Sequence, residues 1–347
     1  MGFPDRHKIL TRGILTRLCW LVLGVAITGC GLMIDAAQKV WPIVSDQTAP
    51  VCQRGRLQVG MAFEPFRPFV FPAIFTDEGL RVTGLDVELV REIAADLSTR
   101  CGGQPIIPVI HLVRFRDLFV ELNEGKLDLF VSAVAANVPA PTRAGLAYST
   151  PYFNGGGLAA IVRRPEVAEL IRARLDRQRD QPPSQDELKG ALEGLTVAVQ
   201  EGRGAHYYAQ ANLAMAKVVL CDSLPAAFES EDPAIDVILG GQPILDYTVT
   251  WVRKDWQRMM LGNRKPLLLS REQYAVVMAE ESYWLRWAVN DLLFRLSESG
   301  RLEAMRRRWL EENYAYPRRA AKEGLPFAAE NMPQHYDQGR CRWAERK

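Results

Sequence analysis

The sequence has few histidines, little net charge and no long apolar run. The four histidines lie far apart, and no group of His, Cys, Asp and Glu has the spacing of a metal site. The formal net charge of the 347 residues is only +2. Residues 1–29 hold four basic residues and one acidic residue, so removing them leaves 39 basic and 40 acidic residues, a charge of −1. The composition therefore predicts no metal, no cofactor and no nucleic-acid partner.

One short apolar stretch is present, at residues 18–27, and it falls short of the roughly 20 apolar residues that a membrane-spanning helix needs. Basic residues precede it, and the small residues Thr28 and Gly29 stand just before Cys30. This is the layout of an exported protein's signal peptide. The stretch 27–30 resembles a bacterial lipobox, in which the cysteine carries the lipid. We expect residues 1–29 to be removed and residues 30–54 to tether a periplasmic, membrane-anchored lipoprotein; an uncleaved anchor or a plain signal peptide are the alternatives.

Six cysteines are present, and four remain when Cys19 and Cys30 are assigned to the signal peptide and the lipid. An even number of cysteines in an exported protein favours disulfides. Four cysteines allow three pairings, and buried free thiols are the other reading. The residues alone leave this choice open.

The order of apolar patterns predicts an α/β protein with a mainly parallel sheet. In the first half, strands at 56–61, 106–110 and 129–134 alternate with helices at 87–97 and 115–122. After a strand at 156–163 and a charged helix at 166–179, a second plan follows, with strands at 195–199, 217–220, 235–239 and 274–278 and helices at 205–212 and 224–228. Helices at 283–296 and 301–310 precede a tail that we expect to be polar and irregular.

A series of short blocks carries a family resemblance: LQVG at 57–60, GLDVEL at 84–89, GKLD at 125–128, TR at 142–143, YSTPYF at 148–153, LTVAVQEG at 195–202, IDVIL at 235–239 and LSESGRL at 296–302. In this order, over residues 55–312, they resemble the family 3 extracellular solute-binding proteins of ABC uptake systems. The resemblance implies a type II periplasmic-binding-protein-like fold, in which two α/β lobes are joined by two crossing hinge strands.

The resemblance also implies a division of the chain. Lobe 1 would comprise residues 55–155 and 280–312, lobe 2 residues 156–279, and residues 313–347 a C-terminal extension. Cys52 and Cys101 would then lie at the end of lobe 1 away from the ligand and form a disulfide, while Cys221–Cys341 would pin the extension to lobe 2. A ligand would bind between the lobes of a monomer, which would pass it to an ABC permease.

Several residues match the positions at which this family holds its ligand. Arg143 matches the arginine that binds the ligand's carboxylate, and such a guanidinium can form two parallel hydrogen bonds with a carboxylate. Phe66 matches the aromatic residue that packs on the ligand, with Phe63 and Phe69 as rivals. A core or surface role is the alternative for each of these residues.

The turn at Arg203 and Gly204 opens a helix after a strand, where free N–H groups favour an anion. A tight connection without a ligand contact is the alternative.

The departures from the family pattern bear on the ligand. Ala133 and Ala135 stand where Ser or Thr is usual, and Gly241, followed by Gln242, stands where an aspartate usually holds the ligand's ammonium group. A buried ammonium without a carboxylate partner is costly. We therefore expect a carboxylate or another anion without an ammonium group, with a neutral ligand or none as the alternatives.

These observations favour a binding protein that is not an enzyme. Two other hypotheses stay open. The first is a dehydratase-like enzyme on the same fold, acting on a cyclic carboxylic acid with Glu64 as general acid or base. The second is a periplasmic partner protein with a degenerate cleft, for which the departures above and the extension at 313–347 are the evidence.

Overall fold

The structure is a computed structural model that describes residues 49–138, 144–175, 183–231, 234–261, 264–331 and 339–344. Two predicted functional residues, the lipid attachment site Cys30 and the ligand-binding arginine Arg143, lie outside the described residues.

One mixed sheet runs through the described part of the molecule, in the strand order β14-β9-β8-β10-β7-β12-β5-β1-β4. Its strands are β1 (Arg56–Ala62), β4 (Ile107–Val113), β5 (Leu129–Ala135), β7 (Phe153–Val162), β8 (Thr196–Gln200), β9 (Lys217–Cys221), β10 (Val237–Gly241), β12 (Leu268–Ala279) and β14 (Cys341–Trp343). Two short strands lie off this path: β6 (Leu146–Tyr148) pairs with β12, and β11 (Gln257–Arg258) pairs with β7.

The sheet divides into two parallel groups that two long strands connect. Strands β5, β1 and β4 are parallel and form the centre of lobe 1, and β10, β8 and β9 are parallel and form the centre of lobe 2. Strands β7 and β12 run between the groups and pair antiparallel with each other. The predicted two-lobed type II fold with two crossing strands is confirmed, whereas the exact lobe boundaries stay a prediction.

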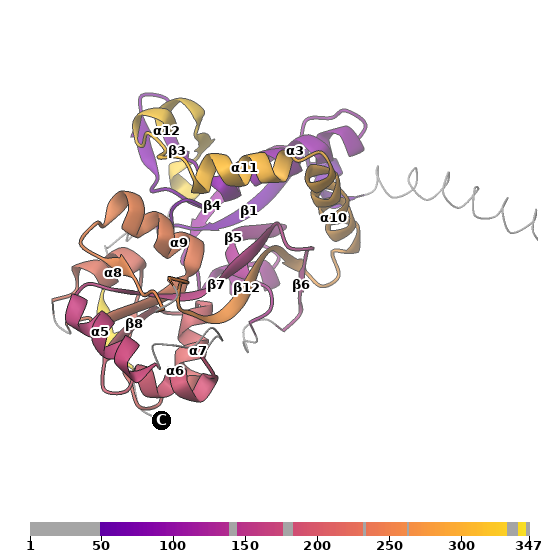
Figure 1. The fold of residues 1–347 in the computed structure, drawn as a ribbon. Helices are drawn as coiled ribbons and strands as arrows, with labels where there is room; N and C mark the ends of the chain where they lie inside the picture. Colours follow the sequence, from indigo (N-terminus) through magenta and orange to yellow (C-terminus); the bar gives the residue numbers. More distant parts are fainter. Residues whose placement is uncertain are drawn as a thin grey trace, which may run out of the picture.

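Helices cover both groups of strands (Figure 1), and the residues that the longer helices bury are mostly apolar. In lobe 1, helix α3 (Leu85–Arg100) buries Leu85, Leu89, Ile93 and Leu97, which recur on one side, against a β5 strand that is buried at every residue. Helices α10 (Tyr283–Glu298) and α11 (Arg301–Leu310) pack on α3, while α4 (Leu118–Asn123) packs on strands β1 and β5. Helices α5 (Pro165–Arg174), α6 (Gln185–Ala191), α7 (Gly204–Asn212), α8 (Leu224–Glu229) and α9 (Gln242–Tyr247) belong to lobe 2.

Several element boundaries differ from those predicted. Strand β12 begins at Leu268, six residues before the predicted start, so that Glu272 lies within a crossing strand. Helix α4 begins at Leu118 rather than at residue 115. The hairpin of β2 (Ile74–Thr76) and β3 (Gly79–Val82) was not predicted, because turn residues separate its two short strands and no alternation is visible.

Both of the expected disulfides form. Cys52 of the short helix α2 (Pro50–Arg54) is bonded to Cys101 at the end of α3, and Cys221 at the end of β9 is bonded to Cys341 in β14. Ala49, Val51 and Cys52 are buried, so the last residues of the predicted tether are packed on lobe 1.

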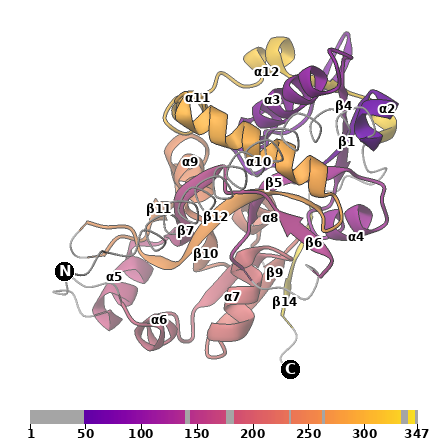
Figure 2. The ribbon, with the colours of Figure 1, turned by 90° about the vertical axis from the view of Figure 1, so that its right-hand side faces the viewer.

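The C-terminal extension is ordered over much of its length, which corrects the expectation of an irregular tail. Helix α12 (Arg318–Glu323) and strand β13 (Leu325–Phe327) follow α11, and β13 pairs with β3 of lobe 1. Further along, β14 pairs with β9 of lobe 2. Figure 2 shows α12 above α3 and β14 beside β9 at the opposite end of the molecule. The extension is therefore bonded to both lobes, not only to lobe 2.

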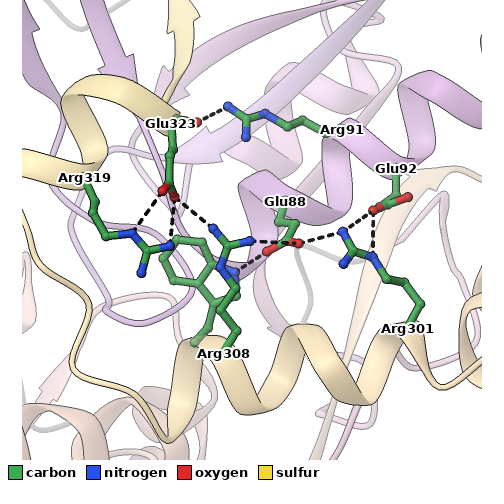
Figure 3. A network of polar contacts seen from close by, with 8 residues as sticks. Glu88, Arg91, Glu92, Arg301, Arg308, Arg319 and Glu323 are labelled. Carbon is green, nitrogen blue, oxygen red and sulfur yellow. Dashed lines mark hydrogen bonds and ion pairs between the residues drawn. The ribbon is translucent and has the colours of Figure 1, made fainter.

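A polar network ties α11 and α12 to α3 (Figure 3). The buried carboxylate of Glu88 accepts a hydrogen bond from the indole nitrogen of Trp309 (2.6 Å) and pairs with Arg301 (3.0 Å). Glu323 of α12 pairs with Arg308 (2.8 Å) and with Arg319 (3.0 Å). This network fixes the start of the extension on lobe 1.

Candidate ligand-binding cleft

A small cavity lies where the two lobes meet the crossing strands. Its volume is about 40 Å³, which leaves room for only a few water molecules, whereas solute pockets usually measure a few hundred Å³. The lining comes from both lobes and from β12, and comprises Phe115, Ala133, Ala135, Gln200, Arg203, Gly204, Ala205, Leu224, Leu239, Gly240, Gly241, Ile244, Glu272 and Tyr274. The protein's own side chains thus fill most of the space between the lobes.

Arg203 reaches from lobe 2 into lobe 1. It is the residue before α7, and its Nη1 donates a hydrogen bond to the carbonyl oxygen of Ser132 on β5 (2.7 Å). Its guanidinium carbon lies 3.5 Å from the ring centre of Phe115 and 4.4 Å from that of Phe66. The other terminal nitrogen, Nη2, is enclosed and has no hydrogen-bond partner among the described residues.

Two titratable groups, Glu64 and Arg203, interact electrostatically beside this cavity. Glu64 is buried and accepts hydrogen bonds from the backbone N–H of Phe115 (3.1 and 3.3 Å). Burial raises the pKa of Glu64 to about 7, against the opposing effect of its own backbone hydrogen bond and of the Arg203 charge. Burial lowers the pKa of Arg203 to about 10, so its guanidinium remains charged at neutral pH.

A third buried group, Asp86, supports the cavity wall from behind. Its carboxylate accepts hydrogen bonds from the Tyr152 hydroxyl (2.7 Å) and from the backbone N–H of Ala133 (2.9 Å). Burial raises the pKa of Asp86 to about 7. Ala133 has a φ of 45°, in the left-handed region that non-glycine residues seldom adopt. The bond from Ala133 to Asp86 therefore helps to hold a strained backbone at the edge of the cavity.

Two glycines of lobe 2 make room for polar side chains of β12. A Cβ at Gly204 would lie 2.6 Å from Oε1 of Glu272, so this carboxylate reaches the first turn of α7 because residue 204 has no side chain. A Cβ at Gly241 would lie 2.1 Å from the hydroxyl oxygen of Tyr274, which in turn donates to Glu272 (3.4 Å). Gly241 stands where this family usually has an aspartate. The hydroxyl of Tyr274 thus occupies the space in which the side chain of that aspartate would begin.

The structure gathers most of the predicted site residues. Ala133, Arg203 and Gly204 line the cavity. The ring of Phe66 contacts the Arg203 guanidinium, and Glu64 interacts with the Arg203 charge. Two predicted residues lie elsewhere. Phe63 is buried with Arg114 over its ring (5.8 Å), and Gln242 donates to Asp246 (3.3 Å) and is not among the lining residues.

Sequence reasoning missed Phe115, Glu272 and Tyr274. Phe115 was assigned to a helix that begins three residues later. Glu272 and Tyr274 belong to a crossing strand whose early, half-exposed part carries no clear alternation. The position of Gly241 next to the hydroxyl of Tyr274 has no local sequence signal, because the pairing of strands far apart in the sequence creates it.

Within the described ranges, no group of three or more His, Cys, Asp or Glu residues is placed to hold a metal ion. None of the helices in the same part of the chain combines the length and the apolar character of a membrane span.

Comparisons with known proteins agree with the fold. The sequence profile of the bacterial extracellular solute-binding proteins, family 3, matches residues 61–312, and the chain belongs to this family. Among curated proteins, none matches the chain.

Solved structures of the same fold cover about three quarters of the chain. A mutant of ArgBP from T. maritima is 25% identical with a TM-score of 0.56, over 76% of this chain and 98% of the other. AbpA from Streptococcus pneumoniae, an amino acid ABC transporter substrate-binding protein bound to L-arginine, is 21% identical (TM-score 0.57; 74% and 94% covered). AncCDT-1, an ancestral amino acid-binding protein described as a precursor of cyclohexadienyl dehydratase, is 19% identical (TM-score 0.57; 75% and 97% covered).

Proposed function

We propose that this protein is a lipid-anchored, periplasmic solute-binding protein that captures a small, carboxylate-bearing solute between its lobes and delivers it to an ABC permease. Family membership supports the general role, and the solute class rests on one observation. Arg203 lines the cavity between the lobes, and its enclosed Nη2 has no hydrogen-bond partner among the described residues. A buried donor of this kind is costly unless a ligand or water accepts its hydrogen bond, and a carboxylate is the strongest such acceptor.

The surroundings favour an anion that lacks an ammonium group. Gly241 offers no carboxylate, and Tyr274 fills the space that a side chain there would need. The carboxylate of Glu272 lies against the first turn of α7, where free N–H groups and the helix dipole stabilise negative charge. A solute carboxylate would find the same stabilisation if the lobes open and β12 carries Glu272 away. The proposed solute therefore differs from the arginine of the solved neighbours.

A second candidate function has its own supporting observation, which is the small volume of the cavity. With about 40 Å³ between the lobes, Arg203 and Glu272 leave no room for an amino acid in this conformation. A periplasmic partner protein with a permanently closed, degenerate cleft would have this appearance. We regard catalysis as the least supported role, because both oxygens of Glu64 lie within hydrogen-bond distance of the Phe115 N–H rather than facing an open pocket.

A thermal-shift screen of the purified protein tests the proposal. We expect small mono- or dicarboxylates to raise the melting temperature, since a ligand at a hundredfold excess over its Kd stabilises by about 2.7 kcal/mol. Arg203→Met should abolish this shift. Arg116→Met is the matched control, because Arg116 pairs with Glu201 (3.2 Å) and is not among the residues that line the cavity. If no carboxylate changes the melting temperature of the wild type, the solute-binding proposal is wrong and the partner hypothesis gains support.

A further inference from the structure

The residues that surround the Arg203 guanidinium together have the composition of a binding site for a cation. We propose that lobe 1 carries a guanidinium-binding slot, formed by the rings of Phe66 and Phe115, the carbonyl of Ser132 and the carboxylate of Glu64, and that this chain fills the slot with its own Arg203. The inference rests on the proposed function only in treating the cleft as a ligand site.

The slot supplies what a guanidinium needs. Two aromatic rings lie 3.5 and 4.4 Å from the guanidinium carbon, within the range of favourable cation–π contact. The Ser132 carbonyl accepts one N–H at 2.7 Å, and the buried Glu64 provides the nearby opposite charge. Among the ion pairs of the described residues, Arg203 takes part in none within 4 Å, in contrast to Arg301 or Arg308. The rings and the carbonyl, rather than a surface carboxylate, therefore hold this cation.

All four parts of the slot belong to lobe 1, and contacts that do not involve Arg203 hold them in place. Glu64 is fixed by the Phe115 N–H, and the Ser132 hydroxyl accepts a hydrogen bond from the backbone N–H of Ala62 (2.7 Å). Phe66 and Phe115 are both buried in the same core. We therefore expect the slot to persist when the Arg203 side chain is removed.

The occupant comes from the other lobe, and this has a consequence for selectivity. While the lobes are closed, the slot cannot accept a free cation, because the guanidinium of Arg203 stands there and repels a second positive charge. Arg203 lines the interlobe cavity, and its enclosed Nη2 has no hydrogen-bond partner among the described residues. One residue thus converts a cation slot into a site that prefers an anion.

The test is rescue of an Arg203→Ala variant by small guanidinium compounds at low millimolar concentration. We expect guanidinium and methylguanidine to raise the melting temperature of the variant with saturation, at about millimolar concentration as so small a ligand allows, and to leave the wild type unchanged. Urea, a neutral molecule of the same shape, should have no such effect on either protein. Adding Phe115→Leu to the variant should remove the response, because it removes the ring in closest contact.

A folded Arg203→Ala variant without a saturable guanidinium response, or a wild type that responds equally, would overturn the proposal. If the variant does not fold, nuclear magnetic resonance of the wild-type protein tests the proposal instead, through the Nε–Hε signal of Arg203. A filled slot predicts a ring-current-shifted signal with slow solvent exchange, and a signal like that of an exposed arginine contradicts it. Guanidinium binding by the variant without carboxylate binding by the wild type would support the slot while refuting the proposed function.

Discussion

The hydroxyl of Tyr274 occupies the space in which a side chain at residue 241 would begin. A Cβ built on Gly241 lies 2.1 Å from this oxygen, closer than real Cβ atoms approach another heavy atom, and 3.4 Å from the ring carbon that carries the hydroxyl. Tyr274 is fully buried between Phe69 and Phe153, so its ring has little freedom to move away. Glycine at 241 and tyrosine at 274 therefore depend on each other.

This dependence predicts a non-additive pair of substitutions. Gly241→Ala should destabilise the protein by about 1–3 kcal/mol, as overpacking of a core does. In a Tyr274→Phe background the added methyl group should cost much less, because only the hydroxyl causes the clash and the backbone of residue 241 (φ −58°) suits alanine. Chemical denaturation of the four proteins of the cycle measures the coupling.

Gly240→Ala is the matched control. A Cβ at the neighbouring residue lies 3.4 Å from Leu245, which is ordinary contact, so the stability should change little in either background. Equal costs of Gly241→Ala with and without the Tyr274 hydroxyl would show that the two residues do not interact as described.

The buried carboxyls of Glu64 and Asp86 predict a pH dependence of stability. Burial raises the pKa of Glu64 from 4.5 to about 7 and that of Asp86 from 3.8 to about 7, so the folded state holds protons that the unfolded state has released. The free energy of unfolding should therefore fall as the pH rises through this window, by about 3 kcal/mol for Glu64 alone at about 1.4 kcal/mol per unit of pKa. Urea denaturation at pH 5 and pH 8 measures the change.

Glu64→Gln mimics the protonated side chain and should make the free energy of unfolding depend less on pH. At pH 8 the variant should therefore become more stable relative to the wild type than it is at pH 5. The exposed Glu298→Gln should keep the wild-type slope. A Glu64→Gln profile parallel to that of the wild type would show that Glu64 does not titrate in the folded protein.

The Cys221–Cys341 disulfide holds the end of the extension on lobe 2, where β14 is only three residues long. Replacing both cysteines by serine should lower the stability by about 2–5 kcal/mol. It should also let trypsin cleave after Arg340 and Arg342, because the contacts of Asp222 with both residues and the Arg342–Glu201 ion pair (2.7 Å) cannot hold so short an edge strand without the disulfide. Wild-type resistance to trypsin in the double variant would contradict this account.

Glu88 should matter more than its neighbour on α3. Glu88 is buried and accepts a hydrogen bond from the indole N–H of Trp309. Glu88→Gln should lower the free energy of unfolding by about 1–3 kcal/mol, because it weakens this charged hydrogen bond. Glu92 pairs with the same Arg301 (2.8 Å) nearer the surface, and Glu92→Gln should cost less than about 1 kcal/mol. Melting temperatures of the two variants make the comparison, and a larger loss for Glu92→Gln would reverse our ranking.

Helices and strands with a regular apolar pattern of their own could be predicted from the sequence. The spacing of Leu89, Ile93 and Leu97 identifies α3, and the unbroken apolar run of β5 identifies a central strand, because burial imposes these patterns directly. Ordered blocks then implied two lobes and the Cys52–Cys101 bond. Arg203 and Gly204 were selected because a helix start after a strand has a recognisable local chemistry.

The rest depends on which distant segments meet. No pattern near Arg203 tells that its side chain crosses to Phe115 of the other lobe rather than facing solvent. Likewise, Tyr274 fills the space beside Gly241 only through the register of β7 and β12 and the position of β10 against β7. The extension was misjudged for the same reason, since β13 and β14 gain their order by pairing with β3 and β9.

The central claim is that Arg203 occupies the cation position of the cleft, so that the wild-type protein takes an anion and refuses a cation. A calorimetric titration of the wild-type protein with L-arginine and agmatine tests it most directly. We predict no saturable binding of either compound, and binding of agmatine once Arg203 is replaced by alanine. Saturable binding of L-arginine or agmatine to the wild-type cleft would contradict the claim.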